Sequence, residues 1–119
     1  MKGRGLIVRM GFALNGLKLA VVRERSVRTH LAAVAGVLAL LLAMRPAPLW
    51  WAVMALTVGF VLAAELLNSA LEVLADRLHP ERHPEIGAAK DIAAGAVLLA
   101  SAVAVAVGLA FLWAHFGGP

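Results

Sequence analysis

The sequence predicts an all-α integral membrane protein, with an N-terminal amphipathic surface helix followed by three transmembrane helices. Of its 119 residues, 62% are hydrophobic, which is more apolar surface than a soluble domain of this length can bury. Long apolar runs are separated by short charged or proline-containing segments. The chain, residues 1–119, is therefore interpreted as a single membrane domain. It contains no cysteine, which excludes disulfides and cysteine nucleophiles.

The surface helix is expected over about residues 5–28, where apolar residues alternate with basic ones. Clustered positive charge before an apolar span is typical of contact with anionic lipid headgroups on the cytoplasmic face, and no nucleic-acid partner is expected. A cleaved signal peptide is not expected either, because charges interrupt every apolar stretch here. The basic residues are Lys2, Arg4, Arg9, Lys18, Arg23, Arg25 and Arg28.

The three spans are expected over about residues 29–45, 49–76 and 86–116. Pro46 and Pro48 separate the first two, and the charged loop over residues 77–85 separates the last two. Trp50 and Trp51 are placed as an interfacial belt. The bias of Lys and Arg puts the N-terminal helix and the 77–85 loop in the cytoplasm and the C-terminus outside.

Glu65, Glu72 and Asp76 share one face of the second span. At 100° per residue, Glu72 and Asp76 fall about 20° to either side of Glu65, and Asn68 lies about 60° away. Glu65 is expected toward the hydrocarbon and Asp76 near the headgroups. An ionisable group in the hydrocarbon costs at least about 2.5 kcal/mol on insertion scales, so the stripe indicates function.

Two other interpretations of the stripe remain open. Asn68 and Ser69 could form a structural hydrogen-bond ladder between helices, although that would not require three acids. The carboxylates could instead form a proton relay or a cation pathway, as in a small proton-coupled membrane transporter. Such a transporter would need neither a cation at the start of the third span nor an acid in the surface helix.

Lys90 and Asp91 stand at the start of the third span, where unpaired backbone N–H groups and the helix dipole favour anions. A lysine there can hold a phosphate. Carboxylates opposite it can hold Mg²⁺, which prefers one or two carboxylates together with phosphate oxygens and water. This combination favours a nucleoside triphosphate site, and the alternative is a solvated helix start with a snorkelling lysine.

The nucleotide-binding and zinc-binding motifs that are common in soluble proteins are missing. Gly3 and Gly5 resemble the start of a glycine-rich loop, but no further glycine has the required spacing, and there is no P-loop. His79, Glu81 and His83 do not have the H-E-x-x-H order, and the prolines between them prevent the helix that would align two imidazoles on zinc. The first segment therefore does not predict a glycine-rich nucleotide loop, and the second does not predict a zinc site.

Five further motifs stand out along the chain: AELLNSALEVLADR (residues 64–77), AAKD (88–91), NGLKLA near Asn15, RERSVR with Glu24, and LWAHFG from Leu112. Together they resemble the signatures of the small bacterial integral-membrane diacylglycerol kinases. The resemblance covers nearly the whole chain. It implies a homotrimer in the bacterial cytoplasmic (inner) membrane, with sites shared between protomers, that uses Mg²⁺ and ATP to phosphorylate a membrane lipid.

The resemblance also implies roles for individual residues. Glu65 would be the general base on the lipid hydroxyl, with Asn68 supporting it, and Glu24 and Glu72 would bind Mg²⁺ with the ATP phosphates. Residues implied in nucleotide binding are Phe12, Glu24, Glu72, Glu81, Arg82, His83, Lys90 and Asp91. Residues implied at the lipid substrate are Arg9, Lys18, Glu65 and Asp76.

The chain departs from the family pattern at two positions near its N-terminus. Phe12 stands where a tyrosine is usual, so stacking on the nucleotide is retained while a hydroxyl contact is lost. An arginine expected by the family aligns with Gly5, so that contact depends on whether Arg4 or Arg9 replaces it.

Different segments of the chain resemble two branches of the family, which phosphorylate different lipids. RTHL (residues 28–31) and KDIAAGAVLLA (90–100) resemble the branch of the family that phosphorylates undecaprenol. LWAHFG and ADRL resemble the diacylglycerol branch, whose product is phosphatidic acid, a phospholipid precursor. Diacylglycerol is the expected substrate, with undecaprenol as the alternative.

Overall fold

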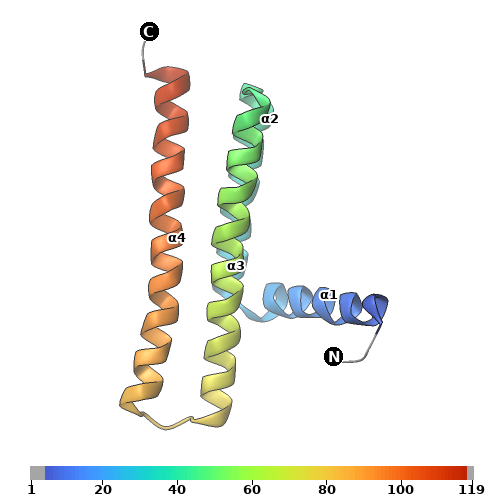
Figure 1. Ribbon diagram of the computed structural model, residues 1–119, viewed down its shortest axis with the longest axis vertical. Helices are drawn as coiled ribbons and strands as arrows, with labels where there is room; N and C mark the ends of the chain where they lie inside the picture. Colours follow the sequence, from blue (N-terminus) through green and yellow to red (C-terminus); the bar gives the residue numbers. More distant parts are fainter. Residues whose placement is uncertain (1–4, 118–119) are drawn as a thin grey trace.

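Four α-helices make up residues 5–117, the part of the chain that the computed structural model describes (Figure 1). They are α1 (Leu6–Arg23), α2 (Arg25–Met44), α3 (Pro48–Leu78) and α4 (Pro84–Phe116). The main contact is between α3 and α4, while α2 packs on α3 and α1 contacts α2. α1 extends crosswise from the other three helices (Figure 1).

The chain changes direction at Glu24, between α1 and α2. Its backbone is extended, with φ −107° and ψ 111°, so Glu24 ends one helix and begins the next. Nη1 of Arg28 donates to the carbonyl oxygens of Val21 and Val22, both at 2.9 Å, and thereby satisfies carbonyls freed by the end of α1. The surface helix expected over residues 5–28 is therefore divided, and residues 25–28 belong to α2.

The two remaining connections contain the prolines. Arg45 ends α2 in the left-handed region, with φ 49° and ψ 58°, and Pro48 begins α3. Proline is tolerated in the first turn of a helix because the backbone N–H that it lacks has no partner there. Pro84 begins α4 in the same way, and Nδ1 of His83 accepts a hydrogen bond from the N–H of Glu85 at 3.1 Å.

Three helices are long and apolar enough to span a membrane: α2, α3 and α4. α2 has 20 residues, and 20 residues of α-helix cover about 30 Å, the hydrocarbon thickness of a bilayer. α3 and α4 have 31 and 33 residues, so each is longer than α2 by more than ten residues. The extra length continues past the level at which α1 leaves the bundle (Figure 1).

The buried core lies at the end of the bundle away from the α3–α4 loop. It contains Leu41, Met54 and Phe111, and Phe111 is 1% exposed. The ring of Trp50 packs edge-on against Phe111 with centroids 5.2 Å apart, so this tryptophan of the expected belt faces inward. Many large apolar side chains elsewhere are exposed, as expected for surfaces that face lipid or another protomer.

Candidate functional site

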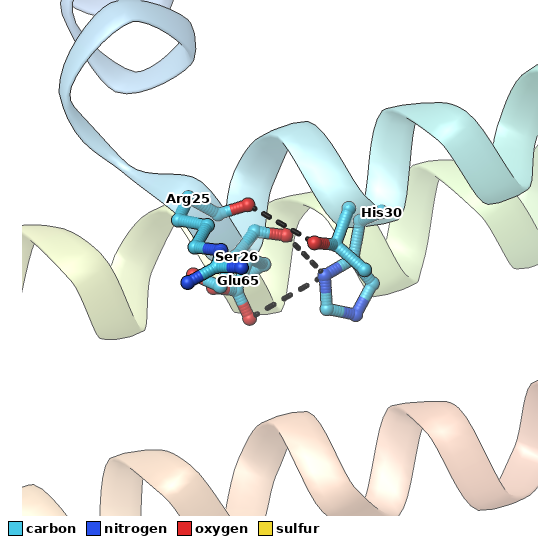
Figure 2. Close-up of polar contacts among 5 residues, drawn as sticks. Arg25, Ser26, His30 and Glu65 are labelled. Carbon is cyan, nitrogen blue, oxygen red and sulfur yellow. Dashed lines mark hydrogen bonds and ion pairs between the residues drawn. The ribbon is translucent and has the colours of Figure 1, made fainter.

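Glu65 is the most buried charged side chain of the described residues, at 3% exposure, and it lies on α3 where α3 packs against the start of α2. Oγ of Ser26 donates a hydrogen bond to Oε1 of Glu65. Nδ1 of His30 lies 3.9 Å from Oε2 (Figure 2). Burial of an ionisable group is expensive unless partners compensate it, and α2 supplies both partners here.

The contact with Ser26 sets the level of Glu65 along the bundle. Ser26 is in the first turn of α2, immediately after the junction with α1. α2 is just long enough to cross the hydrocarbon once, so its first turn is one end of that candidate span. Glu65 therefore lies level with the first turn of α2, and Asp76 follows it on α3, nearer the α3–α4 loop.

Two polar side chains follow Glu65 on α3. Ser69 is 6% exposed. Asn68 has a buried side-chain oxygen, Oδ1, that lacks a hydrogen-bond partner among the described residues. A buried unsatisfied carbonyl is unfavourable by about 1 to 3 kcal/mol, so this oxygen is suited to a donor from a ligand or a second protomer.

Asp76 and Lys90 form an ion pair across the α3–α4 hairpin, with Nζ of Lys90 donating to Oδ1 of Asp76. Their side chains are 65% and 34% exposed, respectively. The pair joins the end of the acidic stripe to the first turns of α4. It lies on the part of the hairpin that extends beyond α1.

A cavity of about 520 Å³ lies at the turn of the hairpin, and we call it the loop cavity. The rings of His79 and His83 meet edge-to-face there, with centroids 5.2 Å apart. Lys90 lines the cavity from α4. Its other polar lining residues include Glu81 and Arg82. Three of the residues expected to bind nucleotide from the loop, Glu81, Arg82 and His83, are thus brought together with Lys90.

A second cavity of about 660 Å³ lies between α1 and α3, and we call it the junction cavity. Its lining is mainly apolar and includes small residues of α1 such as Gly16 and Ala20. Glu24, Arg77 and the buried Ser69 also line it. Glu24 is therefore brought next to α3, the helix that carries the acidic stripe.

Other expected site residues are not brought together within one chain. Glu72 and Asp91 are exposed on α3 and α4. Arg9, Lys18 and Phe12 are exposed along α1. Residues 5–117 contain no group of three or more His, Cys, Asp or Glu side chains that could hold a metal ion. Arg4, the other candidate for the contact at Gly5, lies outside the described residues.

Ser26 and His30 were not among the residues singled out from the sequence. They are four residues apart, a spacing that puts two side chains on the same face of a helix. The expected surface helix ran through residue 28 and hid this spacing, because it assigned the two residues to different helices. A break at Glu24 would have placed both on one face at the start of α2.

The chain is similar to proteins of one family along most of its length. The model of the family described as prokaryotic diacylglycerol kinase matches residues 11–112. The diacylglycerol kinase of Escherichia coli strain K12 is 37% identical over 94% of this chain and 92% of its own length. The undecaprenol kinase of Bacillus subtilis strain 168 is 35% identical over 72% of this chain and 70% of its own. The diacylglycerol kinase of a Synechocystis strain is 38% identical over 87% of this chain and 59% of its own.

Proposed function

The chain belongs to the prokaryotic diacylglycerol kinase family and is a lipid kinase, and on that premise we propose that it transfers the γ-phosphoryl group of ATP to diacylglycerol, giving phosphatidic acid. The transporter interpretation is not retained, because the family consists of kinases. The observation that carries the proposal is the placement of Glu65. It is a buried carboxylate that contacts the first turn of α2. We propose that this turn lies at the membrane boundary, at the level of the lipid hydroxyl.

Glu65 is proposed as the general base. Its carboxylate accepts the proton of the lipid hydroxyl while that oxygen forms a bond to the γ-phosphorus and the bond to the ADP leaving group breaks. Asn68 is proposed to orient a reacting group through its amide, since its Oδ1 is buried without a partner in the described chain. Phosphoryl transfer needs little covalent help, so holding the two reactants in line is most of the catalysis.

The nucleotide is proposed to bind along the acidic face between the loop cavity and Glu65. Lys90 lines that cavity and supplies a cation for the phosphates, which would compete with Asp76 for its Nζ. The carboxylate of Asp76 would then be released, and Asp76 is proposed to support the site of the lipid substrate. The other residues proposed to contact nucleotide are Phe12, Glu81, Arg82, His83 and Asp91, and those proposed at the lipid are Arg9 and Lys18.

Glu24 and Glu72 are proposed to hold Mg²⁺ together with ATP. Two carboxylates are too few for a metal centre made of protein alone, but they fit an ion that takes its remaining ligands from phosphate oxygens and water. When bound, the ion neutralises charge on the transferred phosphoryl group. Glu24 lines the junction cavity and Glu72 is exposed on α3, so both remain accessible to a nucleotide.

A homotrimer with shared sites is proposed as the active form. In one chain Glu72 and Asp91 are exposed, and large apolar side chains cover much of the surface of the three long helices. α1 is proposed to lie on the cytoplasmic face of a bacterial inner membrane, where its basic residues would meet anionic headgroups. The N-terminus would then be cytoplasmic and the hairpin beyond α1 would reach the cytoplasmic ATP.

Undecaprenol is the alternative substrate, favoured by the likeness to the Bacillus subtilis undecaprenol kinase. The test incubates purified protein in mixed micelles with ³²P-labelled ATP. Diacylglycerol and undecaprenol are supplied in separate reactions. Mg²⁺-dependent label in diacylglycerol is the expected result. Label in undecaprenol alone would make undecaprenol the assigned substrate, and label in neither lipid would contradict both substrate assignments.

A further inference from the structure

We infer that Ser26 and His30 are positioning residues that aim the carboxylate of Glu65 at the lipid hydroxyl. The inference rests on the proposed role of Glu65 as general base and adds to it two residues of α2. Together they hold the carboxylate from one side, and we call them the Ser26–His30 clamp (Figure 2).

Ser26 contacts both Glu65 and His30. Its hydroxyl donates to Oε1 of Glu65, and its backbone carbonyl lies 2.8 Å from Nδ1 of His30. A carbonyl oxygen can only accept, so Nδ1 of His30 carries the hydrogen. The orientation and the tautomer of the imidazole are therefore fixed by the same residue that binds the carboxylate.

The clamp distinguishes the two oxygens of Glu65. The single hydroxyl hydrogen of Ser26 is donated to Oε1. Oε2 lies 3.9 Å from the N–H edge of His30, too far for a hydrogen bond but close enough for electrostatic attraction. Oε2 is therefore the oxygen assigned to the substrate proton, and His30 restricts its direction of approach.

The surroundings of His30 agree with a place beside the lipid. His30 also lines an apolar cavity of about 390 Å³ between α2, α3 and α4, together with Val34, Leu62 and other apolar side chains. Its side chain is 27% exposed, whereas that of Glu65 is 4% exposed. The clamp thus lies between the buried carboxylate of Glu65 and an apolar cavity.

A purely structural role for Ser26 makes a different prediction. If its hydroxyl only satisfied a buried carboxylate, its loss would lower the free energy of unfolding and leave turnover of the folded protein unchanged. A positioning role predicts lower kcat with unchanged substrate binding, because a misdirected base slows the chemical step alone. The two roles can therefore be separated by kinetics on folded protein.

The experiment measures kcat and KM for ATP and lipid in mixed micelles, together with thermal stability, for five single variants. Ser26→Ala and His30→Ala each remove a clamp contact, and kcat is expected to fall by about 10- to 100-fold with KM within about twofold. Ser26→Thr keeps the hydroxyl, and His30→Asn keeps an N–H near the position of Nδ1, so both are expected to recover most of the lost kcat. Thr29→Ala is the matched control.

Thr29 is exposed on the same turn of α2 and its hydroxyl bonds only the carbonyl of Arg25, so its removal is expected to leave kcat unchanged. Normal kcat in folded Ser26→Ala, or equal losses in Ser26→Ala and Ser26→Thr, would overturn the inference. Failure of the unaltered protein to phosphorylate either lipid would instead contradict the proposed function, so the two failures are distinguishable.

Discussion

Lys90 on α4 is paired with Asp76 on α3, across the end of the α3–α4 hairpin that is nearer its loop. Both side chains remain partly exposed. An ion pair in such a position contributes only about 0 to 1 kcal/mol to stability, because water screens it. The pair holds the ammonium of Lys90 beside the loop cavity, where the phosphates are proposed to bind.

Replacement of Lys90 separates its contribution to stability from its proposed contribution to ATP binding. Lys90→Met is expected to raise the KM for ATP at least tenfold, because a charged hydrogen bond to phosphate is lost. Its melting temperature is expected to stay within a few degrees of the unaltered protein. Steady-state kinetics over a range of ATP concentrations, with thermal denaturation in detergent, measures both. A change in melting temperature without a change in KM would assign the lysine a structural role.

Glu65→Gln tests the general base. The amide keeps the shape of the carboxylate but cannot accept the substrate proton, so kcat is expected to fall by about 10²- to 10⁴-fold. ATP binding should persist, since the residue lies away from the loop cavity. Turnover is followed with labelled ATP, and binding with a fluorescent nucleotide. Near-normal turnover would remove Glu65 from the mechanism.

Glu24→Gln and Glu72→Gln test the proposed metal ligands. Each amide is a poorer ligand for Mg²⁺ than a carboxylate, so the Mg²⁺ concentration for half-maximal activity is expected to rise at least tenfold. Glu85→Gln, an exposed change in the first turn of α4, serves as the control and should leave the Mg²⁺ dependence unaltered. Unchanged curves for both test variants would place the metal elsewhere.

Phe111→Ala tests the core at the far end of the bundle. Phe111 is 1% exposed and its ring packs against Trp50 and His115, so truncation is expected to lower stability by about 3 to 5 kcal/mol. Trp113→Ala removes a ring that is 74% exposed on the neighbouring surface, and we expect a change below about 1 kcal/mol. Denaturation in mixed micelles compares the stability of the two variants. Equal losses would show that the bundle does not depend on this core.

Hydropathy and proline positions located the three long helices closely. Pro48 and Pro84 begin α3 and α4, because proline fits the first turn of a helix and cannot continue a preceding one. The boundary at Glu24 was missed, since neither proline nor glycine marks it. It depends on a tertiary arrangement, with α1 turned away from α2 and Arg28 bonding the last carbonyls of α1.

The acidic residues of α3 and the Lys90–Asp91 pair could be found from residue type and helical periodicity, because an ionisable group in an apolar helix is conspicuous. The different surroundings of these residues could not be predicted from residue type and periodicity. Glu65 is buried beside Ser26, Asp76 pairs with Lys90 and Glu72 stays exposed, although all three share one stripe. Periodicity gives the direction of a side chain around its own helix and says nothing about the neighbour it meets.

The amino-acid sequence by itself determined the family and the three helices of the described chain that are long and apolar enough to span a membrane, since these follow from hydropathy, charge and motif. It also indicated the residues that are proposed for phosphoryl transfer. Only the tertiary structure decided that Glu65 is buried and that it contacts Ser26 and His30. The physical reason is that these contacts join residues nearly forty positions apart. They form only when the break at Glu24 brings the first turn of α2 onto the face of α3.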